Sequence, residues 1–115
     1  MLKLYDYPQC PFSQKTRIVL AEKQLDYEKI HVDLRKREQF DPSFLSLNPF
    51  HKVPVLVDEE EGDEQRTVVY DSTIIDEFLE DEYPEPALMP PPEDAAGRMR
   101  IRQLEDFADI AFVLP

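Results

Sequence analysis

The stretch Cys10-Pro11-Phe12-Ser13 decides how this chain is interpreted, because it joins two different patterns. The apolar run Leu2 to Tyr5 predicts a short strand before it, and the run from about Phe12 to Glu22 predicts a helix after it. Pro11 suits the first helical position, where its missing N–H would have no partner. The free N–H groups of a first helical turn and the positive end of the helix dipole both stabilise an anion. The single cysteine of the chain is therefore predicted to be a nucleophilic thiolate.

Outward from this junction, strand and helix patterns alternate. The predicted elements are, in order, a half-buried strand over 28–34, a short irregular helix over 36–47, and a hairpin of strands over 53–57 and 66–70 joined by a charged turn over 59–64. Apolar residues four apart then predict a third helix from about Ile74 to Tyr83, with Asp71 or Ser72 as its N-cap. The order β-α-β-α-β-β-α predicts an α/β domain with a mixed sheet, which is the thioredoxin-like arrangement.

Proline divides the rest of the chain. We expect residues 1–83 to form the thioredoxin-like domain and residues 84–92, which are rich in proline, to form an extended linker. Residues 93–115 read as one helix with an apolar stripe, and a lone helix of this kind needs a surface to pack on. We therefore interpret it as the first helix of an all-α domain whose remainder is absent.

Composition limits the classes of partner. The 115 residues are 42% hydrophobic, enough for a core, and carry a formal net charge of -12, which repels nucleic acid and anionic lipids. The acidic clusters Asp58 to Glu64 and Asp76 to Glu85 indicate either a solvated surface or a docking face for a basic protein. The N-terminus lacks a signal-peptide pattern, no run is long enough to span a membrane, and one cysteine cannot build a disulfide framework. We expect a cytoplasmic protein.

Four features together resemble the N-terminal, thioredoxin-like domain of the glutathione S-transferases. They are Cys10-Pro11-Phe12-Ser13, the run Asn48-Pro49-Phe50-His51-Lys52-Val53-Pro54-Val55-Leu56, the pair Asp71-Ser72 at a helix start, and Leu88-Met89-Pro90 before the last helix. The cysteine motif is most similar to the omega and glutaredoxin-related branch. The run Arg17 to Lys23 is also similar to bacterial stringent starvation protein A, a relative that works by binding RNA polymerase.

The resemblance implies a glutathione site. Cys10 would be the catalytic nucleophile, and Ser13 stands where dithiol glutaredoxins carry a second cysteine, so a one-thiol route follows. The Ser13 hydroxyl would either serve the helix start or donate to the Cys10 sulfur. Val53 and Pro54, joined by a cis bond in the family, would pair with the peptide backbone of glutathione.

Other residues of the implied site would hold the two ends of glutathione. Asp71 and Ser72 would bind its γ-glutamyl end at a helix N-terminus, and Phe12 would flank the thiol. Lys52, Arg37 and Lys36 are alternative partners for the glycyl carboxylate. The two histidines, His31 and His51, have no other metal-ligating residue at a suitable spacing in the sequence. We therefore expect structural roles for them and no metal cofactor.

The expected function is glutathione-dependent thiol transfer or reduction through Cys10, by an enzyme that forms a homodimer. Conjugation is less favoured, because a cysteine tends to form a mixed disulfide with glutathione. Three alternatives stay open: an inert, buried cysteine, a partner-binding protein without catalysis like the polymerase-associated relative, and a glutathione-binding module without turnover. The resemblance also implies that the second-substrate pocket is built largely by the helical domain, of which residues 93–115 would supply the first helix.

Overall fold

The computed structural model describes residues 1–60 and 65–113 of the chain. The strands and longer helices are β1 (Leu2–Asp6), α1 (Pro11–Glu22), β2 (Tyr27–His31), α2 (Pro42–Leu45), β3 (Val55–Glu59), β4 (Arg66–Tyr70), α3 (Ser72–Glu82) and α4 (Ala95–Ala108). Two 3₁₀ turns, η1 (Leu34–Lys36) and η2 (Glu38–Phe40), precede α2, and a π-helical turn, η3 (Asp109–Val113), follows α4. None of the described helices has the length and apolar character needed to cross a bilayer.

The four strands form one mixed sheet in the order β2-β1-β3-β4. Strands β1 and β2 are parallel, whereas β3 is antiparallel to both β1 and β4. A helix connects the parallel pair and a hairpin supplies the antiparallel pair, as expected from their separations in the sequence. The predicted thioredoxin-like fold is thereby confirmed.

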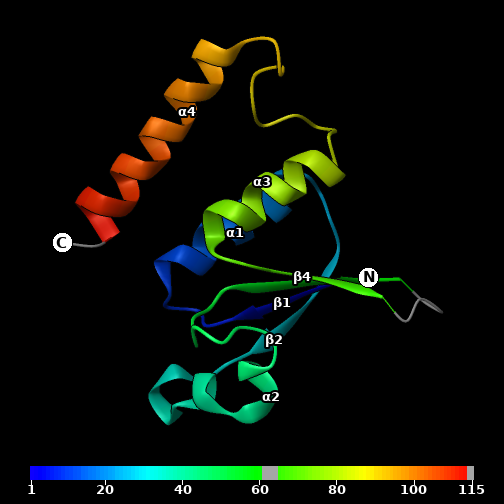
Figure 1. Ribbon diagram of the computed structural model, residues 1–115, viewed down its shortest axis with the longest axis vertical. Coiled ribbons are helices and arrows are strands. Elements are labelled where there is room, and N and C mark those ends of the chain that lie inside the picture. The colour runs from blue at the N-terminus through cyan, green and yellow to red at the C-terminus, as the bar shows by residue number, and fades with distance from the viewer. Residues whose placement is uncertain (61–64, 114–115) are drawn as a thin grey trace.

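Both faces of the sheet are covered (Figure 1). Helices α1 and α3 pack on one face, where Leu2, Leu4 and Leu56 meet Leu20 and Ile75 in the larger core. The second core lies on the opposite face, beneath α2 and the turns that precede it. Its buried members are Val32, Phe44, Leu47, Val53, Val55 and Val57. Because side chains alternate along a strand, β3 contributes to both cores.

The segment predicted as one irregular helix over 36–47 is instead three short pieces. Arg37, with φ 62°, separates η1 from η2, and α2 begins only at Pro42. The Asp33 carboxylate accepts from the Arg35 N–H at 3.0 Å, while the Glu38 carboxylate accepts from the Asp33 N–H at 2.7 Å. Such local side-chain bonds compete with a continuous helix. The structure therefore corrects this prediction.

Other boundaries differ by a few residues. The strand predicted over 28–34 covers Tyr27–His31, and the strand predicted over 53–57 begins at Val55, after a cis peptide bond between Val53 and Pro54. Of the predicted charged turn over 59–64, residues 61–64 lie outside the described residues.

The linker is fixed to the domain rather than simply extended. The buried ammonium group of Lys23, at the end of α1, lies 2.8 Å from a Glu80 carboxylate oxygen. It also donates to the carbonyl oxygens of Tyr83 and Pro86, at 2.8 Å and 2.9 Å. The same Glu80 carboxylate accepts from the Leu88 N–H at 3.0 Å. These contacts set where the chain turns toward α4.

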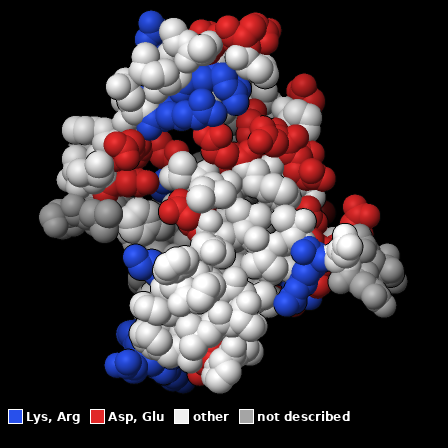
Figure 2. Space-filling view, viewed as in Figure 1, with Lys and Arg blue, Asp and Glu red and all other residues white. Residues whose placement is uncertain are grey.

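Helix α4 contacts the domain through charged groups. None of its residues is buried, and Ile101, Leu104 and Phe107 of the predicted apolar stripe are exposed. Arg102 pairs with Glu77 of α3 at 2.8 Å, and Lys15 of α1 pairs with Glu105 and Asp109 at 3.2 Å and 2.9 Å. Figure 2 shows basic side chains gathered on α4 beside acidic side chains of the domain.

A loop held by Asn48 leads from α2 into β3. The Asn48 side chain is 2% exposed; its amide donates to the Lys52 carbonyl at 2.9 Å and its oxygen accepts from the Phe50 N–H at 2.9 Å. His51, inside the loop, has φ 51°. One side chain therefore satisfies two backbone groups of a tight loop.

We expect Asn48→Ala to reduce the free energy of unfolding by about 1–3 kcal/mol, because the Lys52 carbonyl and the Phe50 N–H lose their partner in a partly buried loop. Asn48→Asp keeps the acceptor for the Phe50 N–H but places a carboxylate oxygen against the Lys52 carbonyl oxygen at a buried position, so it should lose at least as much. Urea unfolding at fixed pH measures both variants. Equal stability of wild type and Asn48→Ala would contradict the assigned role.

A second prediction concerns Asp76 of α3, whose carboxylate accepts from the Thr16 hydroxyl at 3.1 Å. Burial raises the pKa of Asp76 to about 7, with Glu105 and Asp109 adding to the rise and Lys15 opposing it. The folded protein thus holds a proton that the unfolded chain releases, and stability should fall as pH rises from about 4 to about 7. Asp76→Asn should remove this loss.

The gain of Asp76→Asn over wild type is expected to be roughly 1–3 kcal/mol larger at pH 8 than at pH 5. Urea unfolding at the two pH values measures it. Asp26→Asn, an identical change at an exposed position, is the control and should show no such difference. A gain that is the same at both pH values would contradict the buried, protonated state.

Candidate functional site

Three chain segments meet at one edge of the sheet because of the strand register. Tyr5 of β1 lies opposite Val55 of β3, which lies opposite Tyr70 of β4. The segment that follows β1, the loop that precedes β3 and the turn that follows β4 therefore leave the sheet at the same edge. They carry Cys10, Val53-Pro54 and Asp71-Ser72 respectively.

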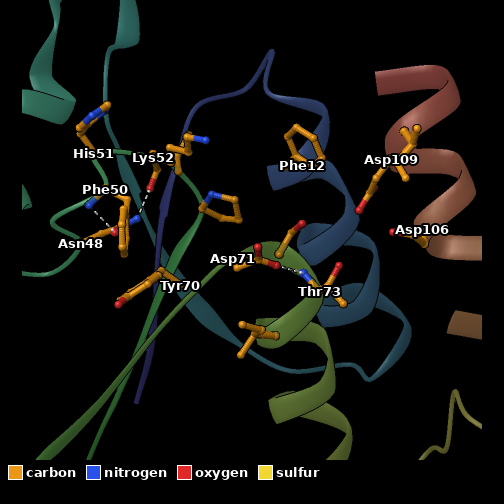
Figure 3. Close-up of a pocket in the computed structure, with 15 residues that line it drawn as sticks. Phe12, Asn48, Phe50, His51, Lys52, Tyr70, Asp71, Thr73, Asp106 and Asp109 are labelled. Carbon is orange, nitrogen blue, oxygen red and sulfur yellow. Dashed lines mark hydrogen bonds between the residues drawn. The ribbon is translucent and has the colours of Figure 1, made fainter. Parts of the chain in front are cut away.

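A pocket of about 830 Å³ lies where these segments and α4 come together (Figure 3). Its lining consists of Phe12, Asn48, Phe50, His51, Lys52, Val53, Pro54, Tyr70, Asp71, Ser72, Thr73, Ile74, Asp106, Asp109 and Ile110. Of the predicted site residues, the structure brings Phe12, Lys52, Val53, Pro54, Asp71 and Ser72 into this lining.

Cys10 lies next to the pocket at the start of α1. It is half-buried and occupies the N-cap position, with Pro11 in the first helical turn as predicted. Its Sγ is 4.0 Å from the Val53 carbonyl oxygen, so the thiol borders the loop before β3. The sulfur therefore lies at a helix start, where the first backbone N–H groups have no intrahelical partner.

Ser13 is fully buried one turn beyond, and its hydroxyl has no hydrogen-bond partner among the described residues. The structure thus contains no hydrogen bond from Ser13 to the Cys10 sulfur. It does not cap α1 either, since Cys10 occupies that position.

The loop before β3 contributes Val53 and Pro54 to the pocket lining. The bond between Val53 and Pro54 is cis, as the resemblance implied, and both residues are buried. Within the described part of the chain, the Val53 N–H donates no backbone hydrogen bond. A peptide lying alongside would find a donor there, as in strand addition.

The start of α3 forms the third wall. Asp71, rather than Ser72, is the N-cap: its side chain accepts from the Thr73 N–H at 3.0 Å, and its φ is 75°. A positive φ at a residue with a side chain is a strained conformation of the kind that concentrates at functional sites. Ser72, in the first turn of α3, is 5% exposed. The free N–H groups of this turn favour an anionic group.

Of the basic candidates, only Lys52 lines the pocket. Arg37 lies on the turn between η1 and η2, with its guanidinium 4.9 Å from the Phe40 ring centre, and neither it nor Lys36 belongs to the lining. The centre of the Phe40 ring lies 4.7 Å from that of the His51 ring. We expected a structural role for His51, and the structure places it in the pocket lining.

Several lining residues carried no separate signal in the sequence. Asn48 and Phe50 lie within the motif that was quoted, and Tyr70 precedes Asp71, so proximity in the chain would have suggested them. The α4 contribution, Asp106, Asp109 and Ile110, comes from more than thirty residues away and depends on tertiary packing alone. Among the described residues, no cluster of three or more His, Cys, Asp or Glu side chains is suited to a metal ion.

Comparison with known proteins agrees with this geometry. Residues 9–82 match the family model described as glutathione S-transferase, N-terminal domain. The chain is 47% identical over 89 residues to glutathione S-transferase Z1 of Arabidopsis thaliana, covering 77% of this chain and 38% of that protein. It is 42% identical over 91 residues to maleylacetoacetate isomerase of Pseudomonas aeruginosa, covering 76% of this chain and 40% of that protein.

A solved structure is also similar. Maleylacetoacetate isomerase from Anaeromyxobacter dehalogenans, crystallised with GSH in its active site, aligns with a TM-score of 0.79 at 40% identity, covering 96% of this chain and 49% of that one. The chain spans about two fifths of the length of the two curated relatives named above. The family match over residues 9–82 and the thioredoxin-like sheet lead to one conclusion: this chain belongs to the glutathione S-transferase family.

Proposed function

We propose that the protein binds glutathione in the pocket beside Cys10 and catalyses glutathione-dependent thiol transfer through that residue. The observation that carries the proposal is the position of the Cys10 sulfur, at the N-terminus of α1 and 4.0 Å from the Val53 carbonyl oxygen. A thiol there borders both the backbone that would pair with a peptide and the cavity that would hold it.

The pocket suits the parts of glutathione. Val53 would pair with the cysteinyl unit, the start of α3 with Asp71 and Ser72 would hold the γ-glutamyl end, and Lys52 would meet the glycyl carboxylate. Solved relatives with bound glutathione support glutathione as the ligand. Arg37 and Lys36 are outside the pocket lining, which favours Lys52 among the basic candidates.

The proposed reaction has two exchange steps. The Cys10 thiolate attacks the glutathionyl sulfur of a mixed disulfide, so that a Cys10–glutathione disulfide forms and the other thiolate leaves and takes a proton from water. A second glutathione thiolate then attacks the glutathionyl sulfur of that adduct. Glutathione disulfide forms, and Cys10 leaves as the thiolate.

Two finer expectations stay predictions. The cysteine motif suggests the omega class, whereas the relatives include proteins named as zeta-class transferases and maleylacetoacetate isomerases. Relatives named as DHAR-type transferases also occur. The homodimer expected from the resemblance likewise stays a prediction.

The alternative is a partner-binding protein without catalysis, of the stringent starvation protein A type. It requires no reactive thiol, whereas the location of Cys10 at a helix start beside a pocket favours catalysis. The next experiment separates the two.

We expect Cys10→Ser to lower kcat/KM for reduction of a glutathione mixed disulfide by at least about a thousandfold, because the nucleophile is removed. Glutathione affinity, measured by calorimetry, should stay within about threefold of wild type, since serine is similar in size. Intact-mass spectrometry should detect a glutathione adduct on wild type alone. Activity retained by the variant would exclude Cys10 as nucleophile. Wild type that binds glutathione without turnover would favour the glutathione-binding module, and wild type that does neither would favour the partner-binding alternative.

Ser13→Ala tests the buried hydroxyl. Because this group has no partner, its removal should leave the free energy of unfolding unchanged or raise it by up to about 1 kcal/mol. We expect the exchange rate to stay within about twofold of wild type. A large fall in rate at unchanged stability would instead show that the hydroxyl hydrogen-bonds the Cys10 thiolate during the reaction.

A further inference from the structure

The pocket has opposite charges at its two ends. Lys52 lies at the end formed by the loop before β3, and Asp106 and Asp109 lie at the end formed by α4 and the turn that follows it (Figure 3). Of the described residues in the lining, Lys52 is the only lysine or arginine. Phe12, two residues after Cys10 in the chain, lies between the Lys52 end and the α4 end of the pocket (Figure 3).

The α4 end retains excess negative charge after its ion pairs are made. The Lys15 ammonium group binds both the Asp109 carboxylate, at 2.9 Å, and the Glu105 carboxylate, at 3.2 Å. One cation thus faces two anions. Asp106 adds another carboxylate, which is exposed and forms no ion pair with a described residue.

This acidic wall has a defined place relative to Cys10. Lys15 is on the same helix as Cys10, one turn and a half along, and it also donates to the Thr73 hydroxyl at 3.2 Å. Its ammonium group therefore joins α1, the start of α3 and the turn after α4. Thr73 and Asp109 both line the pocket, so Lys15 holds the acidic residues at the α4 end of the pocket close to α1 and to the start of α3.

We propose that Asp106 and Asp109 make the α4 end of the pocket a charge filter, so that the second substrate is neutral or cationic and carboxylates are rejected. The inference rests on the proposed function, since it concerns the group attached to the glutathionyl sulfur. That group extends from Cys10 past Phe12 toward the wall. A cleft lined by charge of one sign concentrates ligands of the opposite sign.

Charge preference is testable without turnover. The probes are three S-substituted glutathiones of similar size that carry 2-aminoethyl, 2-hydroxyethyl and 2-carboxyethyl groups. We expect affinity, measured by calorimetry, to decrease in that order by about fivefold per step, since one unit charge faces another across a few ångströms of solvated pocket. The steps should shrink as salt is raised, because exposed charges are screened.

Asp106 provides a graded series of variants. Asp106→Asn should compress the ranking and Asp106→Lys should reverse it, with each probe's affinity expressed relative to the same variant's affinity for glutathione. Asp26→Asn is the matched control. Its exposed carboxylate precedes the start of β2, at the opposite end of the sheet from Cys10, and it should leave the ranking unchanged. Thermal unfolding confirms that each variant is folded.

The outcomes separate this inference from the proposed function. Equal affinities for the three probes, or a ranking that Asp106→Lys does not change, would overturn the charge filter while glutathione binding stands. The expected ranking without any disulfide exchange would support the filter and overturn thiol transfer. No binding of glutathione by wild type would overturn both. Exchange rates with the three corresponding mixed disulfides, each divided by the uncatalysed rate, should follow the same ranking.

Discussion

The pairing register of β1, β3 and β4 is the constraint on which the site depends. Tyr5, Val55 and Tyr70 lie in one row across the sheet, so the segments that hold Cys10, Val53 and Asp71 emerge together. A slip of one residue would turn every side chain of a strand to the opposite face. Burial of Leu4 and Leu56 under α1 and α3, and of Val55 and Val57 on the other face, opposes such a slip. Packing of the two cores therefore fixes the positions of Cys10, Val53 and Asp71 relative to one another.

In a chain with a net charge of -12, three basic side chains hold separate elements together through ion pairs. Lys23 holds the linker, Arg102 holds α4 to α3, and Lys15 holds the turn after α4 to α1 and α3. The Glu105 and Asp109 carboxylates would repel each other without a cation between them. Lys15 pairs with both, which joins α1 to the end of α4 and leaves one net negative charge in the group. The acidic pocket wall is a consequence of this arrangement.

Expectations that depend on neighbouring residues were confirmed, whereas those that depend on individual side-chain contacts failed. The helix start at Pro11, the N-cap at Asp71 and the apolar spacing of α3 depend on neighbouring residues, and the structure confirms them. The segment 36–47 did not form one helix, because side chains of Asp33 and Glu38 bind nearby backbone. Arg37 was expected near glutathione, but it stacks on Phe40 away from the pocket lining. An interruption of this kind depends on individual side-chain bonds that periodicity does not report.

The sequence by itself determined the order of the elements, the thiol at a strand-to-helix junction and the proline before β3, because these follow from periodicity and from residues adjacent in the chain. The tertiary structure alone decided that Lys52 rather than Arg37 faces the pocket, and that His51 lines it. It also placed Asp106 and Asp109 opposite them. The physical reason is that a pocket is formed by segments distant in the chain, whose meeting depends on strand register, on the Asn48 loop and on ion pairs such as that of Lys15.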